Sequence, residues 1–192
     1  MSQFSGFSES ELKEILKAWA AISLMFAIAI NGIAFDVSFL YAVFFAAITA
    51  GIGFIVHELA HKFTAELLGC RAEFRAFDSM LFIGVLLSVT GFIFAAPGAV
   101  MIQGRPGKRE NGMISSAGIA GSLLTALVFF IINIFSVSDM INSISFYGQQ
   151  INSWIAMFNL IPFGNFDGRK VLNWNKIIYI VLLIFALGLM FF

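Results

Sequence analysis

The sequence is poor in charge, in cysteine and in histidine, and these shortages exclude several classes of protein. Only 11% of the 192 residues are charged, whereas a soluble domain averages about a quarter. So little charge cannot cover a water-facing surface, so lipid must cover the chain instead. A single cysteine, Cys70, excludes an intrachain disulfide. The eleven basic residues form no long basic face, so nucleic acid is not an expected partner.

Apolar sequence is what the chain has in excess. Hydrophobic residues make up 60% of the chain, and the mean hydropathy is +0.94. A helix needs about 20 apolar residues to cross the hydrocarbon core of a bilayer. Candidate stretches are residues 15–35, 37–56 with a helical continuation to 68, 113–135, 145–161 and 177–192. We therefore expect an all-α membrane protein, a polytopic bundle of five to six transmembrane helices in one domain, residues 1–192.

The apolar stretch 79–102 is ambiguous because Gly91 and the pair Pro97-Gly98 interrupt it. The short runs 92–94 and 99–102 flank the Pro-Gly pair like two strands around a turn. We interpret the stretch as a short helix followed by a membrane-associated β-hairpin that re-enters the bilayer. Non-helical backbone at that depth must be shielded by protein or line a watery cavity.

The basic residues favour the re-entrant interpretation. With 79–102 re-entrant, all eleven basic residues fall on one side of the membrane, and the opposite loops, 31–39 and 136–145, contain none. The positive-inside rule makes the basic side cytoplasmic, together with the N-terminus. A plain six-span bundle is the alternative, but it would move Arg105, Lys108 and Arg109 to the other side.

The segment His57-Glu58-Leu59-Ala60-His61 has the pattern H-E-x-x-H at the end of an apolar stretch. On a helix, side chains i and i+4 project from one face, so both imidazoles can bind one divalent cation. Zinc accepts such ligands, keeps one position for water and lowers the pKa of that water toward neutrality. Glu58 is then the candidate general base. These are the only two histidines, which favours a metal site over a chance match.

A catalytic zinc ion needs a third protein ligand, and a carboxylate is favoured because no histidine remains. Asp167 is the candidate, because it follows an apolar stretch on the same side of the membrane. Pro162, Gly164 and Gly168 would unwind the chain there and could direct the carboxylate back toward the histidines. The residues alone leave two interpretations open, a metal ligand or an ordinary turn aspartate before glycine.

Taken together, His57–His61 and Asn159-Leu160-Ile161-Pro162…Phe166-Asp167-Gly168 resemble the two motifs of the site-2 protease family of intramembrane zinc metalloproteases. That family has H-E-x-x-H on one membrane helix and N-x-x-P-x-x-x-[LF]-D-G on a later one. The resemblance covers about residues 37–172.

The resemblance implies one zinc ion (Zn²⁺) per chain, bound by His57, His61 and Asp167, with Glu58 as the base. It also implies that Asn159 lies near the scissile carbonyl, where an amide donor would stabilise the oxyanion. Helix capping or an interhelical hydrogen bond is the alternative role of Asn159.

The resemblance further implies a minimal catalytic core without an appended PDZ or CBS domain. Its expected activity is hydrolysis of peptide bonds within or near the transmembrane segments of membrane protein substrates. The expected partners are a membrane-spanning protein substrate and the lipid bilayer. The expected location is the cell membrane, with several crossings and with the N-terminus and active-site opening on the cytoplasmic side.

In one segment the chain departs from the family pattern. Many members have A-G-P-x-x-N between the two motifs, whereas this chain has Ala117-Gly118-Ile119-Ala120-Gly121-Ser122. The exchange of asparagine for Ser122 leaves a polar role at this position open to question. Gly118 and Ser122 lie four residues apart, which favours close approach of another helix.

Two other functional classes fit the same residues. A metal-binding membrane transporter would also carry ionisable residues within its spans, although no internal repeat supports it. A non-catalytic membrane scaffold with a structural metal is the other alternative. Polar residues around the end of the metal-binding helix could hydrate an entrance to the site, or they could be an ordinary solvated helix end: Lys62, Glu66, Arg71, Glu73 and Arg75.

Overall fold

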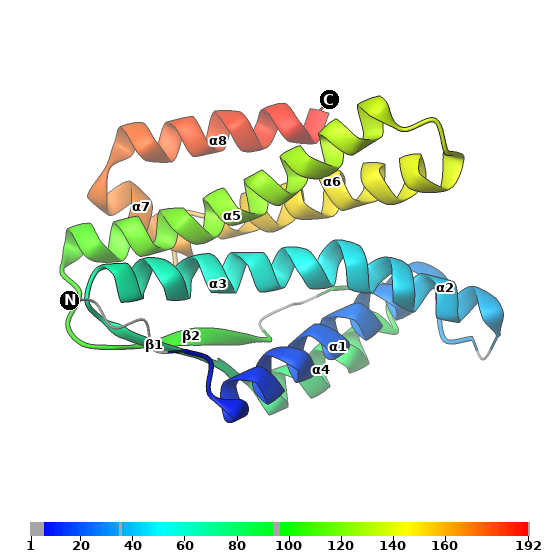
Figure 1. The fold of residues 1–192 in the computed structure, drawn as a ribbon, viewed down its shortest axis with the longest axis horizontal. Helices are drawn as coiled ribbons and strands as arrows, with labels where there is room; N and C mark the ends of the chain where they lie inside the picture. The colour runs from blue at the N-terminus through cyan, green and yellow to red at the C-terminus, as the bar shows by residue number, and fades with distance from the viewer. Residues whose placement is uncertain (1–5, 35, 94–96, 192) are drawn as a thin grey trace.

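The computed structural model describes residues 6–34, 36–93 and 97–191, which form a helical protein with one small antiparallel sheet (Figure 1). Its elements follow in chain order: α1 (Glu9–Asn31), α2 (Val37–Ala46), a π-helical turn (Ala47–Gly51), α3 (Ile52–Leu67), β1 (Arg71–Ala76), α4 (Asp78–Ser88), β2 (Gly98–Gln103), α5 (Lys108–Phe135), α6 (Asp139–Asn159), α7 (Asp167–Trp174) and α8 (Lys176–Phe191).

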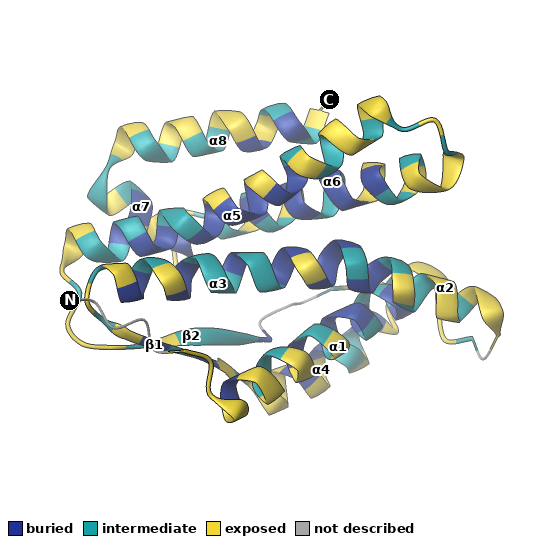
Figure 2. Cartoon of the chain, viewed as in Figure 1, coloured by how far each residue is buried: buried dark blue, intermediate teal, exposed yellow. Residues whose placement is uncertain are grey.

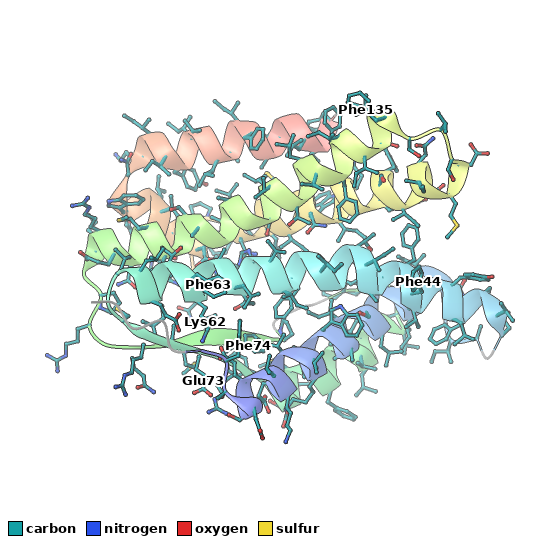
Figure 3. All side chains as sticks on the ribbon, viewed as in Figure 1. Phe44, Lys62, Phe63, Glu73, Phe74 and Phe135 are labelled. Atoms are coloured by element: carbon teal, nitrogen blue, oxygen red, sulfur yellow. The ribbon has the colours of Figure 1, made fainter. Side chains whose placement is uncertain are left out.

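Three helical stretches in the described part of the chain are long and apolar enough to cross a membrane. They are Glu9–Asn31, Val37–Leu67 and Lys108–Phe135, and α4 and α8 are shorter apolar helices. Large apolar side chains cover the outer faces of these helices, as in Phe44, which is 54% exposed, and Phe135, which is 79% exposed (Figures 2 and 3). Water would solvate such a surface poorly, so the membrane character expected from the sequence agrees with the fold.

Helix α3, which contains His57 and His61, lies between two packed groups of elements (Figure 1). On one side α5, α6, α7 and α8 enclose an apolar core that includes Ile119, Leu160 and Val171. On the other side α1 and β1 pack against α3 around Ile22 and Phe74. Both cores bury apolar side chains at helix spacing, and together they hold α3 in a fixed position.

The helix from Val37 to Leu67 is continuous but contains the π-helical turn Ala47–Gly51 in its middle. A π turn leaves carbonyl groups without their ordinary i+4 partners. Side chains from two other helices bind carbonyls of this turn: the Trp19 indole N–H donates to Ala47 O at 3.1 Å, and Asn152 Nδ2 donates to Thr49 O at 3.4 Å. The irregular turn is therefore fixed by α1 and α6.

The predicted β-hairpin around Pro97-Gly98 is wrong in its pairing. β2 pairs antiparallel with β1, from Arg71 opposite Gln103 to Ala76 opposite Gly98, so the two strands are separated by the whole of α4. Residues 92 and 93 form no strand, and residue 94 lies outside the described residues. Apolar runs beside a Pro-Gly pair satisfied the local hairpin pattern, but the polar segment after α3 supplied the partner strand.

The short helix predicted in 79–102 is present as α4, and its length bears on the membrane crossing. Its 11 residues rise about 16 Å, whereas the hydrocarbon core is about 30 Å thick. β2 then returns to the end of the molecule from which β1 came (Figure 1). α4 alone is therefore too short to cross the hydrocarbon core.

The helices predicted at 113–135, 145–161 and 177–192 are present as α5, α6 and α8, and each begins before its predicted range. The chain is non-helical from Leu160 to Phe166, where Pro162 predicted a break. The short helix α7, which follows that break, was not predicted from the sequence. It begins at Asp167 and directs the first turn of a helix toward α3.

Candidate metal centre

Three side chains from two distant segments of the sequence meet between α3, α5 and α7. His57 and His61 lie one turn apart on α3, and their Nε2 atoms are 3.0 Å apart. Asp167 Oδ2 lies 2.9 Å from His61 Nε2 and 3.5 Å from His57 Nε2. All three residues are buried, with exposed fractions of 4%, 8% and 7%. The structure thus brings together every residue that the sequence suggested as a metal ligand.

Two glycines allow this convergence. A Cβ at Gly118 would overlap the His61 imidazole, so α5 can approach α3 only where that side chain is missing. A Cβ at Gly168 would overlap the carbonyl of Leu160, so the first turn of α7 can fold back onto the end of α6. Each glycine therefore removes the steric barrier that would keep one ligand away from the others.

Hydrogen bonds from α5 orient both imidazoles. His61 Nδ1 lies 2.8 Å from the carbonyl oxygen of Ile114, which can only accept, so Nδ1 donates its proton. His57 Nδ1 lies 2.9 Å from Ser122 Oγ, which can accept in the same way. In neutral rings of this tautomer, both Nε2 lone pairs point at the centre of the cluster. Such partners are the usual means of orienting a metal-bound histidine.

The carboxylate of Asp167 is oriented by its other oxygen. Ser115 Oγ donates to Oδ1 at 2.9 Å, and the half-exposed Lys170 Nζ donates to the same atom at 3.2 Å. Oδ2 is left facing the two imidazoles. Ser115 and Ser122 are both buried on α5, so this one helix positions a histidine and the aspartate at once.

The donor set fits a zinc ion in type and in spacing. Zinc binds imidazole nitrogen and carboxylate oxygen at about 2.0–2.2 Å, so a tetrahedral ion separates its ligand atoms by about 3.3 Å. The three separations here are 2.9, 3.0 and 3.5 Å. With both imidazoles neutral and protonated at Nδ1, the three ligand atoms would present lone pairs to one shared cation. Two nitrogens and one oxygen also leave the fourth position free for water, as in catalytic zinc sites.

The candidate base, Glu58, lies beside the ligands on α3 and near the sheet. Val100 of β2 packs against the cores that contain Phe54 and Ala65, which lie on α3 on either side of Glu58. Asn159 lies at the C-terminal end of α6, half-buried, and its amide donates to the carbonyl of Ile155 in the same helix at 3.0 Å. Its role near a scissile carbonyl stays a prediction.

Sequence reasoning missed the residues that orient the ligands. Ser122 was left without a clear polar role, yet it binds His57. Ser115 and Lys170 were not singled out, although each binds Asp167. The signal available was spacing, because Ser115 and Ser122 lie seven residues, or about two turns, apart and so share a face of α5.

The interpretation of Lys62 and Glu66 as residues that hydrate an entrance is wrong. Lys62 is 1% exposed and Glu66 is 4% exposed, and they form an ion pair with each other at 3.3 Å. Lys62 also binds Glu11 of α1 at 2.9 Å. The polar side chains at this end of α3 therefore belong to a buried cluster.

Comparison with known proteins adds an independent finding. No family profile matches the chain, and no solved structure matches it. The chain is 36% identical over 190 residues to a protein of Methanocaldococcus jannaschii named "Putative zinc metalloprotease MJ0611". The aligned region covers 97% of this chain and 95% of that protein. The chain therefore belongs to the same zinc metalloprotease family as its Methanocaldococcus relative.

Proposed function

We propose that this protein is an intramembrane zinc protease of the site-2 protease type, which hydrolyses peptide bonds within or near the transmembrane segments of other membrane proteins. The observation that carries the proposal is the buried cluster of His57, His61 and Asp167, whose ligand atoms all lie within 4.8 Å of one another. Its two histidines lie on a helix that is long and apolar enough to cross a membrane. A site built on such a helix acts on substrates that lie in lipid.

The chemistry follows from the residues around the cluster. A zinc ion bound by the three ligands would acidify a water molecule and polarise the peptide carbonyl. Glu58 accepts a proton from the attacking water as the new carbon–oxygen bond forms. The same carboxyl delivers that proton to the leaving nitrogen as the peptide bond breaks. Ser122 and Ser115 keep His57 and Asp167 in position throughout, because their hydrogen bonds do not involve the reacting atoms.

The free edge of β2 supports peptide binding beside the base. In β1, the N–H groups of Phe74 and Ala76 donate to side chains of α1, which shows that they point away from β2. In an antiparallel pair the directly opposite residues, Val100 and Gly98, then also point their backbone groups outward. Val100 packs against apolar cores on either side of Glu58 along α3. An unwound substrate segment that pairs with this edge would lie along the metal centre.

The placement of the chain in the membrane is also proposed. The C-terminal end of α3, both strands, the N-terminal end of α5 and α7 lie together at one end of the molecule (Figure 1). These segments contain most of the basic residues, which the positive-inside rule assigns to the cytoplasm. With α4 re-entrant, the chain crosses the cell membrane five times. Water then reaches the metal centre from the cytoplasmic side.

The test is cleavage by protein reconstituted in lipid vesicles. The probes are single-span proteins that carry a fluorescent domain at each end and a helix-breaking Asn-Pro or Gly-Gly pair in the span. We expect zinc-dependent cleavage by the natural protein and a loss of about 10²–10⁴-fold in Glu58→Gln, with zinc content unchanged, because only the proton carrier is removed. A soluble peptide with the same sequence should be cleaved poorly.

The other functional classes predict different results. A metal transporter would move zinc across the vesicle membrane, would still do so after Glu58→Gln, and would cleave no probe. A scaffold would bind zinc with the same ligands and do neither. Either result, together with full zinc occupancy, would reject the protease proposal.

A further inference from the structure

Lys62 follows the metal ligand His61 directly, but it faces another part of the molecule. Its ammonium group donates to Glu11 Oε2 of α1 at 2.9 Å and to the carbonyl of Ala72 in β1 at 2.7 Å, and it pairs with Glu66 at 3.3 Å. The Phe7 ring covers the ammonium at 5.2 Å from the ring centre. Figure 3 shows Lys62 extending from α3 toward the sheet.

This ionic clamp, defined as Lys62, Glu11 and Glu66, is almost fully buried. The three residues are 1%, 1% and 4% exposed. Lysine is rarely buried, and removing its charge from water is costly unless every donor is satisfied. Apolar residues of similar volume would often give equal or better stability at such a position. A buried ionic cluster that joins three elements is better explained by the orientation that it imposes.

The clamp fixes the edge of β1 that faces away from β2. Glu11 accepts from Lys62 through Oε2 and from the backbone N–H of Phe74 through Oε1, at 2.9 Å each. The next outward N–H, that of Ala76, donates to Glu14 at 3.1 Å. Ala72 contributes the outward carbonyl that binds Lys62. Successive outward backbone groups of β1 are thus tied to α1 and α3, so β1 cannot slide along α3.

The opposite edge of the same two-stranded sheet lies at the metal centre. Val100 pairs with Phe74 across the sheet and packs against the cores that contain Phe54 and Ala65, on either side of Glu58 along α3. Lys62 and Glu58 both lie on α3, four residues apart. Lys62 therefore fixes β1 to α3, and β1 fixes β2 by strand pairing. The position of β2 relative to Glu58 on α3 depends on both sets of contacts.

We propose that Lys62 and Glu11 are positioning residues that set the register of the substrate-binding strand relative to the metal centre and so determine which peptide bond is cleaved. The inference rests on the proposed protease function and on strand pairing at β2. Backbone pairing repeats every two residues, so a strand that slips presents a bond two residues away. The clamp suppresses such slips.

The first test measures the position of cleavage, which a merely structural role would not move. Glu11→Gln keeps the shape of the side chain but removes the charge that holds Lys62. We expect mass spectrometry of the probe products to show cleavage spread to bonds two residues on either side, and the KM to rise about tenfold with zinc content unchanged. The natural protein should cut one bond.

Arg75→Gln is the matched control, because Arg75 lies on the same strand, is exposed, and pairs with the Glu73 side chain at 3.0 Å. It should leave the cleaved bond and the KM unchanged. If Glu11→Gln cleaves the same single bond as this control, with the same KM, the positioning role is rejected while the protease function stands.

A second measurement keeps the inference testable without cleavage. Amide hydrogen exchange of residues 72–76 and 98–103 should quicken in Glu11→Gln, whereas exchange of the metal-binding turn 57–61 should not. If Glu11→Gln does not fold, Glu14→Met removes the acceptor of the Ala76 N–H at a partly exposed site, and the same change should follow on a smaller scale. Unchanged exchange in both strands would overturn the proposal.

Discussion

Two buried polar clusters are built on adjacent residues of α3, His61 and Lys62. They differ in the source of their positive charge. In the metal centre, neutral His57 and His61 would direct their Nε2 lone pairs, together with Oδ2 of Asp167, at one shared cation that is not part of the chain. In the clamp, the ammonium of Lys62 is the cation, and it is permanently attached. The first cluster is therefore suited to an exchangeable metal ion, whereas the second is suited to fix α1 and β1 against α3.

The largest effect is expected when a ligand is removed from the metal centre. Asp167→Ala leaves two imidazoles, so we expect zinc content to fall from one per chain to a small fraction and probe cleavage to fall to the level of Glu58→Gln or below. Metal analysis of purified protein measures the first quantity. Asp139→Ala is the control, because Asp139 also occupies the first turn of a helix but is exposed. Full zinc occupancy in Asp167→Ala would show that the ligand set is different.

The next largest effect is expected when the ionic clamp loses its cation. Lys62→Met fills a similar volume but leaves Glu11 and Glu66 without their shared cation, so we expect the free energy of unfolding in detergent to fall by about 3–5 kcal/mol. Zinc per folded chain should stay at one, because the Lys62 ammonium binds Glu11, Ala72 and Glu66 rather than the metal ligands. Lys17→Met is the control: this exposed lysine pairs with Glu14 and Asp78, and its loss should cost less than about 1 kcal/mol. Equal losses in both variants would remove the distinction between the clamp and a surface ion pair.

The smallest effect is expected when the hydrogen bond that orients His57 in the metal centre is removed. Ser122→Ala removes the partner of His57 Nδ1 without touching the ligand atoms, so we expect zinc affinity to fall about 10–100-fold, measured by competition with a chelator. Ser116→Ala is the control, since Ser116 Oγ binds the carbonyl of Met113 in its own helix. A Ser122→Ala protein with natural affinity would mean that packing alone orients His57.

The parts of the fold that follow from local patterns could be predicted from the sequence. Apolar stretches of helical length gave α1, α5, α6 and α8, and the four-residue spacing placed His57 and His61 on one face of a helix. The break at Pro162 was also predictable, since proline cannot continue a helix. Such features depend on residues within a few positions of one another.

The parts that depend on distant contacts could not be predicted. The partner of β2 is a charged segment more than twenty residues earlier, and no local pattern reveals it. Lys62 was assigned to water because lysine is nearly always exposed, and its burial becomes visible only when Glu11 and Ala72 are placed beside it. Ser122 gained its role only from the position of His57.

The π-helical turn Ala47–Gly51 has a consequence for the direction in which α3 faces. Each residue advances an α-helix by about 100°, so a turn that holds an additional residue rotates everything after it relative to everything before it. Without this turn, the lipid-facing row of α2 would continue in a different line along α3, and His57 and His61 would swing away from α5. Trp19 and Asn152 bind the carbonyls of that turn. They thereby fix the direction around the axis of α3 in which both imidazoles point, although neither residue belongs to the metal centre.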